Sequence, residues 1–199
     1  MKIVSFLIVL IRKSRSFTLL SLRRLASLFR VIGLKLKGGI DISWKTQVGK
    51  GVFIQATNGG RILIGNGTAI SSNVQIISQG SSVVIGKNSF IGPSSIIVSK
   101  SGITIGNDAL IAERVSIRDQ DHNIHKSIEY KINQSGFISK PIQIDDDVWI
   151  ATGAVILKGV IIEKGAVVAA NAVVNTNIKS LEIVGGIPAK CIGTRRVNK

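Results

Sequence analysis

The sequence repeats with a period of six residues. From Ile144 to Val174 a branched aliphatic residue occupies every sixth position, a spacing that neither an α-helix nor a β-strand produces by itself. Four positions after each of these residues stands a small or apolar one: Val148, Ala154, Val160, Ala166, Ala172 and Ile178. Gly or Asn, which tolerate a left-handed backbone, recurs in the same register at Gly153, Gly159, Gly165, Asn171 and Asn177. The pattern predicts a solenoid in which each repeat is a short strand followed by a sharp bend.

The same register extends back to Ile42 and groups the aliphatic positions in threes. All eighteen positions are Ile or Val: Ile42, Val48, Ile54, Ile64, Ile70, Ile76, Ile85, Ile91, Ile97, Ile105, Ile111, Ile117, Ile144, Ile150, Ile156, Ile162, Val168 and Val174. Three repeats per group predict a coil with three flat sides, so that six coils stack as a triangular prism. Extra residues occur only between the groups. Every insertion is therefore expected to leave the prism at the same corner.

Over residues 40–199 the sequence resembles the hexapeptide-repeat acyltransferases, and the segment from Gly185 to Lys190 matches their closing Gly-x-Pro-Ala-Lys pattern. The resemblance implies a left-handed parallel β-helix, whereas connections between parallel strands are otherwise right-handed. The expected fold class is all-β, a prism of about six coils with an N-terminal helical segment and a protruding loop. The expected organisation is a basic amphipathic helical segment at 1–39, a β-helix at 40–178 with an inserted loop at 118–141, and a closing strand and tail at 179–199.

The N-terminal segment is both basic and apolar. The net charge is +15, and residues 1–39 hold nine basic residues and no acidic one. The apolar run Ile3 to Ile11 is too short to span a bilayer and is followed by basic residues where a signal peptide has small ones. From Phe17 to Ile32 one helical face collects five apolar residues: Leu22, Leu25, Leu28, Phe29 and Ile32.

Such a helix suits two roles, and the sequence leaves both open. It can lie on an anionic membrane surface, which predicts a cytoplasmic protein with peripheral membrane contact through residues 1–37. Alternatively, it can cap the end of the prism. The single cysteine, Cys191, suits a reducing compartment. Nucleic acid is not an expected partner, because the arginines are interspersed with leucines and not with stacking aromatic residues.

The longest insertion, between Ile117 and Ile144, holds both histidines of the chain. Imidazole can accept a proton near neutral pH. The segment from Ile117 to Asp121 resembles the Ile-Arg-Asp-x-Asp sequence that precedes the active histidine of saccharide O-acetyltransferases, which implies that His122 is the general base. His125 is the alternative, since its spacing to Trp149 fits the galactoside-type members better.

A base also needs a partner that orients its ring, and three carboxylates in the insertion are candidates: Asp119, Asp121 and Glu129. The two histidines with neighbouring aspartates could instead bind a metal. No metal is expected, because a closed zinc site usually needs more imidazole or thiolate ligands than two.

The resemblance further implies that acetyl-CoA is the acyl donor. By position, the residues that would line its pantetheine arm are Trp149, Ala151, Thr152, Ala170, Asn175 and Thr176. Two departures from the family pattern stand out, since Ala151 replaces a common Gly and Asn175-Thr176 replaces a common Thr-Lys. Because that lysine often reaches the nucleotide, the phosphate contacts are expected from Lys190 or Arg195.

The function expected from these features is acetyl-CoA-dependent O-acetylation of a saccharide hydroxyl, on a cell-surface polysaccharide or its precursor, by a homotrimer. In the resembled family, each loop reaches a neighbouring chain. Two alternatives stay open: N-acetylation of an amino sugar, which the same base would serve, and a β-helix that acts only as a scaffold. The sequence does not identify the acceptor sugar.

Overall fold

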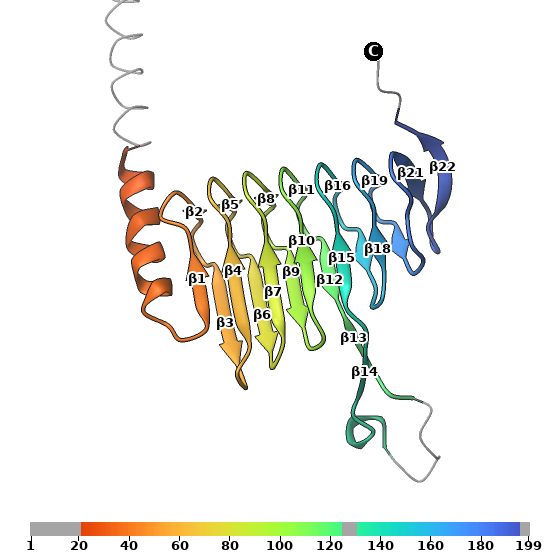
Figure 1. Cartoon of the computed structure of the whole chain (residues 1–199), viewed down its shortest axis with the longest axis horizontal. Coiled ribbons are helices and arrows are strands. Elements are labelled where there is room, and N and C mark those ends of the chain that lie inside the picture. Colours follow the sequence, from red (N-terminus) through yellow and green to blue (C-terminus); the bar gives the residue numbers. More distant parts are fainter. Residues whose placement is uncertain (1–20, 125–130, 196–199) are drawn as a thin grey trace, which may run out of the picture.

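Three β-sheets, parallel except for the last strand of one of them, enclose the core of the chain, as the repeats predict. The structure is a computed structural model that describes residues 21–124 and 131–195. Each coil contributes one strand to each of three walls, and equivalent strands of successive coils pair in register (Figure 1). The predicted fold class, an all-β parallel β-helix of six coils, is confirmed.

Wall A contains β1 (Ile40–Ile42), β4 (Arg61–Ile64), β7 (Ser82–Ile85), β10 (Ile103–Ile105), β15 (Ile142–Ile144) and β18 (Ile161–Ile162). Wall B contains β2 (Gln47–Val48), β5 (Ala69–Ile70), β8 (Phe90–Ile91), β11 (Leu110–Ile111), β16 (Trp149–Ile150), β19 (Val167–Val168), β21 (Glu182–Gly185) and β22 (Lys190–Thr194). Wall C contains β3 (Phe53–Thr57), β6 (Gln75–Gln79), β9 (Ile96–Ser99), β12 (Ser116–Arg118), β17 (Val155–Ile156) and β20 (Val173–Val174).

The core consists of the aliphatic positions of the repeat. All eighteen are buried, with exposed fractions of at most 4%. The small or apolar residues four positions later, from Val148 to Ile178, are buried as well. Every wall of every coil thus places a β-branched side chain inside, and such side chains pack well from strands that are buried on one face. The wall A strands add a second inward side chain at Ile62, Val83, Ile103 and Ile142.

The bends use left-handed backbone conformations at most of the predicted positions. The backbone angle φ is +69°, +78° and +73° at Gly153, Gly159 and Gly165, and +57° at Asn171. The prediction is wrong for Asn177, which is not among the residues with positive φ. The hexapeptide register ends there, and the side-chain oxygen of Asn177 accepts a hydrogen bond from the Ile161 amide at 2.9 Å.

All insertions leave the prism where the chain passes from wall C to wall A, the C–A corner. The extra residues of the first three coils lengthen the wall C strands to five, five and four residues, compared with two in β17. The fourth coil instead releases a hairpin of β13 (Gln120–His122) and β14 (Phe137–Ser139), with a 3-10 helix at Ile132–Gln134 between them. Figure 1 shows this hairpin projecting from the side of the prism opposite wall B.

The N-terminal helix, described over residues 21–35, covers the end of the prism at the first coil (Figure 1). Its Ser27 hydroxyl accepts a hydrogen bond from the Val48 amide at 2.8 Å, and Arg30 donates to the Val48 carbonyl at 3.0 Å. These two side chains satisfy the edge strand β2, which has no neighbouring strand on this side among the described residues. Val31 and Leu34 are buried on the same face.

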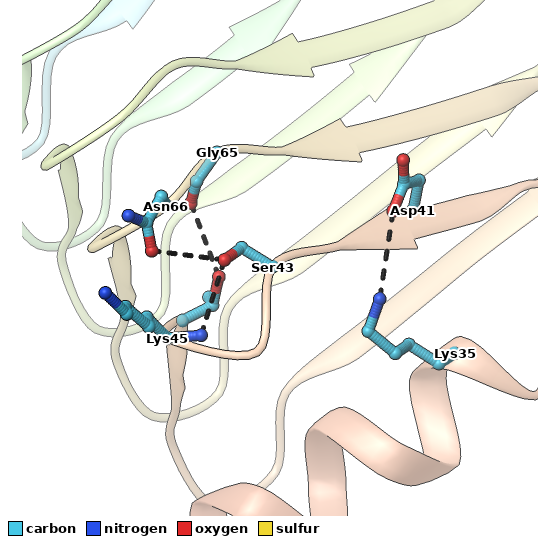
Figure 2. Close-up of polar contacts among 7 residues, drawn as sticks. Lys35, Asp41, Ser43, Lys45, Gly65 and Asn66 are labelled. Atoms are coloured by element: carbon cyan, nitrogen blue, oxygen red, sulfur yellow. Dashed lines mark hydrogen bonds and ion pairs between the residues drawn. The ribbon is translucent and has the colours of Figure 1, made fainter.

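The helix therefore caps the prism, but through a different face from the apolar stripe seen in the sequence. The stripe residues Leu22, Leu25, Leu28, Phe29 and Ile32 are all exposed. At the C-terminal end of the helix, Lys35 Nζ lies 3.9 Å from the Asp41 carboxylate on β1 (Figure 2). The turn that follows β1 is connected to the second coil by a hydrogen bond from the Ser43 hydroxyl to Asn66 Oδ1.

Two parts of the predicted N-terminal segment lie outside the described residues: the apolar run Ile3 to Ile11 and the start of the helix at 17–20. Within the described part of the chain, no helix is long and apolar enough to cross a bilayer. At the other end, β21 turns back into the antiparallel strand β22, which pairs Gly185 with Lys190.

Candidate active site

The hairpin at the C–A corner carries His122 at a defined position. Residue pairs across its two strands are Gln120 with Ser139, Asp121 with Ile138 and His122 with Phe137. The imidazole of His122 packs on the Phe137 ring, with centroids 4.5 Å apart and planes tilted by 34°. The ammonium of Lys100 lies 4.0 Å from the Phe137 centroid, a cation–π contact on the same ring. His122 is exposed, so its ring can meet a ligand outside the prism.

A buried carboxylate fixes the base of this hairpin. Asp119 is fully buried, and its Oδ2 accepts hydrogen bonds of 2.7 Å from the Ser99 hydroxyl and from the backbone amides of Ser101 and Gly102. Its Oδ1 accepts a fourth, also 2.7 Å, from the Lys100 amide. Hydrogen bonds to a charged acceptor are stronger than neutral ones. Asp119 thus attaches the start of the insertion to the preceding coil.

The next coil supports the hairpin from the other side. Lys158 forms an ion pair with Asp121. The backbone of Lys140, at the end of the hairpin, donates to the Asp119 carbonyl at 2.9 Å and accepts from the Gly159 amide at 3.1 Å. Gln120 Oε1 is buried and accepts no hydrogen bond within the described chain. The hairpin base is therefore held by coils on both sides of it.

Of the three carboxylates considered as partners of the base, two are engaged elsewhere. Asp119 binds the corner at 99–102 and Asp121 binds Lys158. Glu129 lies outside the described residues, as does His125. Among residues 21–124 and 131–195 there is no group of three or more His, Cys, Asp or Glu side chains that could hold a metal ion.

Trp149 lies on the outer face of wall B, half exposed. Directly beside it in the ladder is Leu110, and beyond that Phe90, both also exposed. On the other side Trp149 pairs with Val167. These residues form an apolar column along wall B, far from the C–A corner where the hairpin leaves (Figure 1).

Ala151 and Thr152 follow β16, and Ala170 follows β19 one coil later, all at the corner between walls B and C. The carbonyl of Thr152 accepts a hydrogen bond from Asn171 in the next coil at 2.8 Å, which places the two turns side by side. The pKa of Glu113 in the preceding coil is lowered, first by a backbone hydrogen bond, then by a hydrogen bond from the Thr152 hydroxyl, and further by the Arg114 charge.

The other residues predicted to contact acetyl-CoA lie elsewhere. Asn175 and Thr176 follow β20 at the C–A corner, one coil beyond Lys158, and both are exposed. Lys190 is exposed on β22. Arg195 forms an ion pair with Asp147, with Nη1 and Oδ2 2.8 Å apart.

Within one chain the predicted site residues therefore lie in two groups that are separate in space. Trp149, Ala151, Thr152 and Ala170 share wall B and its corner with wall C, whereas His122, Asn175 and Thr176 share the C–A corner. Sequence reasoning missed Lys158, Lys100 and Phe137. A signal for Lys158 exists in the repeat register, because this residue occupies the C–A corner of the coil directly after the insertion.

Comparisons with known proteins agree with this architecture. A model described as "Bacterial transferase hexapeptide (six repeats)" matches residues 141–176, and one described as "Hexapeptide repeat of succinyl-transferase" matches residues 82–113. The chain is 32% identical over 152 residues to "Probable acetyltransferase Rv3034c" of Mycobacterium tuberculosis, covering 76% of this chain and 50% of that protein. It is 32% identical over 122 residues to the galactoside O-acetyltransferase of Escherichia coli, covering 61% and 57%.

Among solved structures, the chain is similar to a hexapeptide-repeat acetyltransferase of Vibrio cholerae in complex with acetyl-CoA. The identity is 30%, the TM-score is 0.52, and the match covers 80% of this chain and 72% of that one. The chain therefore belongs to the hexapeptide-repeat acyltransferase family. It spans about half the length of the curated relatives that it matches.

Proposed function

We propose that this protein is an acetyl-CoA-dependent O-acetyltransferase that modifies a saccharide hydroxyl. The observation that carries the proposal is the position of His122, exposed at the end of a short strand whose base is attached to the prism by the buried Asp119. Rigid placement matters because proton transfer needs a base within hydrogen-bond reach of the acceptor. The galactoside O-acetyltransferase and the acetyl-CoA complex among its relatives support the substrate classes.

In the proposed reaction His122 accepts the proton of the acceptor hydroxyl while the hydroxyl oxygen attacks the thioester carbonyl carbon. The new C–O bond forms and the C–S bond breaks through a tetrahedral intermediate. The leaving CoA thiolate takes the proton back from the imidazolium. No covalent bond between the enzyme and the acetyl group is needed, and atoms and charge balance without a further reactant.

The residues proposed to receive the donor suit a narrow, mostly apolar arm. Ala151 and Ala170 are small side chains in neighbouring turns, beside the exposed indole of Trp149. For the phosphates, Lys190 offers an exposed cation. Arg195 can serve only by exchanging the Asp147 carboxylate for a phosphate, which costs little because an exposed ion pair contributes about 1 kcal/mol or less.

We further propose that the active protein is a homotrimer. The apolar column of wall B, with Phe90 39%, Leu110 52% and Trp149 50% exposed, offers each copy a surface to bury. A cyclic arrangement lets the hairpin of one copy reach wall B of the next and closes after three copies. This contact supplies the juxtaposition of His122 with Trp149 that a single chain lacks.

The direct test measures the release of CoA thiol from acetyl-CoA with a panel of saccharide acceptors that includes amino sugars. The matched pair of variants is His122→Ala and His125→Ala, two histidines three residues apart. His122→Ala should lower kcat by at least about 10²-fold at unchanged thermal stability. Loss of activity in His125→Ala alone would assign the base to His125. Acetylation of amino sugars only would contradict O-transfer, and no turnover with any acceptor would favour the scaffold alternative.

A second test asks whether the site is shared between copies. His122→Ala and Trp149→Ala proteins, each of low activity, are unfolded together, refolded and assayed as a mixture. Mixed assemblies contain sites with both native residues if the two residues come from different copies, so activity should return. Activity no higher than that of the separate variants, or a monomeric mass by light scattering, would rule out the shared site.

The acyl donor, acetyl-CoA, also indicates the cellular compartment in which the protein would act. A reaction that consumes acetyl-CoA fits the cytoplasm, and the exposed thiol of Cys191 suits the reducing conditions found there.

A further inference from the structure

The N-terminal helix presents two opposite faces with different partners. One face is buried against the prism through Ser27, Val31 and Leu34. At about 100° per residue, the opposite face carries an unbroken apolar stripe. Its members and exposed fractions are Leu22 58%, Leu25 51%, Leu28 41%, Phe29 65% and Ile32 37%, and Leu36, the first residue after the helix, is 82% exposed. Folding of the described chain leaves this stripe uncovered, although residues of this kind usually find a partner.

Cations border the stripe on both sides. The same angular spacing puts Arg24 and Lys35 on one flank and Arg23 and Arg30 on the other, where the Arg30 guanidinium also donates to the Val48 carbonyl of the prism. Residues 1–40 contain no acidic side chain, so the first carboxylate that the helix meets is that of Asp41. Seen along its axis, the helix has a face fixed to the prism, two basic flanks and an outward apolar stripe.

An exposed tryptophan adds to this end of the molecule. Trp44 lies in the first turn after β1 and is 60% exposed. The Lys35 ammonium lies 4.8 Å from its ring centroid, which places the indole beside a basic flank of the helix. Tryptophan next to lysine or arginine is typical of the level where lipid headgroups meet the acyl chains.

We propose that this end of the prism docks on an anionic lipid bilayer, with the stripe immersed at the level where the acyl chains begin and the flanking cations among the headgroups. An amphipathic helix with a strongly basic polar side and no acidic residue matches such a surface in both hydrophobicity and charge. A second copy of the same helix is a poorer partner. Packing two stripes against each other brings the basic flanks of both together with no acid in either helix to compensate.

The docked orientation fixes the height of the hairpin. The hairpin leaves the fourth coil, which is three coil spacings of about 4.8 Å from the first, so its base stands roughly 14 Å above the helix end of the prism. Wall B and the C–A corner then run away from the membrane and stay open to water.

The test is flotation of the full-length protein with phosphatidylcholine vesicles that contain or lack phosphatidylglycerol. The parent should float with the anionic vesicles and detach as salt is raised. Replacing two stripe residues, Leu25→Ser with Phe29→Ser, should weaken binding by at least about tenfold. The matched control, Ile187→Ser with Ile192→Ser, removes two exposed apolar residues far from the helix and should bind like the parent.

A second pair of variants tests the charges. Arg23→Gln with Arg24→Gln should weaken binding to anionic vesicles, whereas Lys164→Gln with Lys179→Gln, at the opposite end of the prism, should not. Failure of the parent to float, or flotation of the stripe variant equal to that of the parent, would overturn the proposal. A fall in the solution mass of the stripe variant with unchanged flotation would also overturn it, because the stripe would then be a contact between copies.

Fluorescence tests the orientation, since the chain contains only two tryptophans. In Trp149→Phe the remaining Trp44 should shift its emission to shorter wavelength when anionic vesicles are added. In Trp44→Phe the remaining Trp149, on wall B, should keep its spectrum. The reverse pattern would place wall B on the membrane and refute the orientation.

Discussion

Two aspartates of the insertion, only two positions apart, should respond very differently to the same substitution. Asp119 is fully buried and accepts four hydrogen bonds from residues 99–102. Asp121 faces solvent and forms an ion pair with Lys158. Asp→Asn keeps the size of the side chain at both positions. The substitution therefore compares a buried anchor with a surface pair in the same segment of chain.

The difference in magnitude follows from the partners. In Asp119→Asn one acceptor oxygen becomes an NH₂ donor that faces backbone amides, so at least one charge-assisted hydrogen bond is lost and its donor is left without a partner. We expect a loss of about 2–3 kcal/mol, since a hydrogen bond to a charged group contributes about 1.5–3 kcal/mol. Asp121→Asn removes an exposed ion pair, with an expected loss of about 0.2–1 kcal/mol.

The readout must be local, because a solenoid can open at one coil without unfolding as a whole. Hydrogen exchange followed by mass spectrometry reports the amides of Ser101 and Gly102, which donate to the Asp119 carboxylate. A loss of about 2–3 kcal/mol predicts exchange roughly 30- to 150-fold faster at these amides. In Asp121→Asn the same amides should exchange no more than about fivefold faster.

Activity provides a second measurement of the same variants. If Asp119 holds the hairpin in position, Asp119→Asn should lower kcat with His122 still present, while Asp121→Asn has a smaller effect. Equal exchange rates in the two variants, within about threefold, would show that the four hydrogen bonds do not carry the attachment of the hairpin and would refute this reasoning.

Two further predictions concern the cap of the prism and the corner between walls B and C. Ser27→Ala should lower the free energy of local opening at the first coil by about 1–2 kcal/mol, measured by hydrogen exchange of the Val48 amide, because this amide loses its acceptor in a buried position. Thr152→Val should raise the pKa of Glu113 part of the way to its ordinary value, measured by NMR titration of the carboxyl carbon, because the Thr152 hydroxyl is one of the groups that lower it. A lowered pKa favours the folded protein at pH above the unfolded value, and this contribution is lost as the pH falls through the lowered pKa. An unchanged pKa would show that the Thr152 hydroxyl does not contribute and that the backbone hydrogen bond and the Arg114 charge lower the pKa without it.

The repeat of the fold was readable from the sequence because its core imposes a strict requirement. Each wall of each coil turns the side chain at its register position inside, and eighteen consecutive register positions meet this requirement with Ile or Val. The common corner of the insertions was predictable for the same reason, since extra residues between groups leave the inward positions in register. The error at Asn177 arose where the repeat ends and the neighbouring coil no longer imposes the bend.

The N-terminal helix shows why hydrophobicity alone did not identify its packed face. The apolar stripe is the more hydrophobic side, yet the prism contacts the side that carries Ser27 and Arg30. The edge strand β2 has backbone groups that need hydrogen-bond partners, and a leucine face cannot supply them. The polar side chains of a helix that caps a sheet edge thus determine which of its faces packs against the edge. The most apolar face is then left for another surface.

The site was predictable only in part because its residues are arranged by different constraints. The local sequence placed His122 on a projecting segment. The contacts that hold this segment come from the coils on either side of it, because Asp119 binds residues 99–102 and Asp121 binds Lys158. The core of the prism separates the C–A corner from wall B, and the rigid ladders cannot bend to bring Trp149 to the hairpin. Under the proposed mechanism each chain therefore encodes two halves of different sites. A motif can specify each half, whereas their meeting depends on the outer surface of wall B, where the hexapeptide register imposes no residue type.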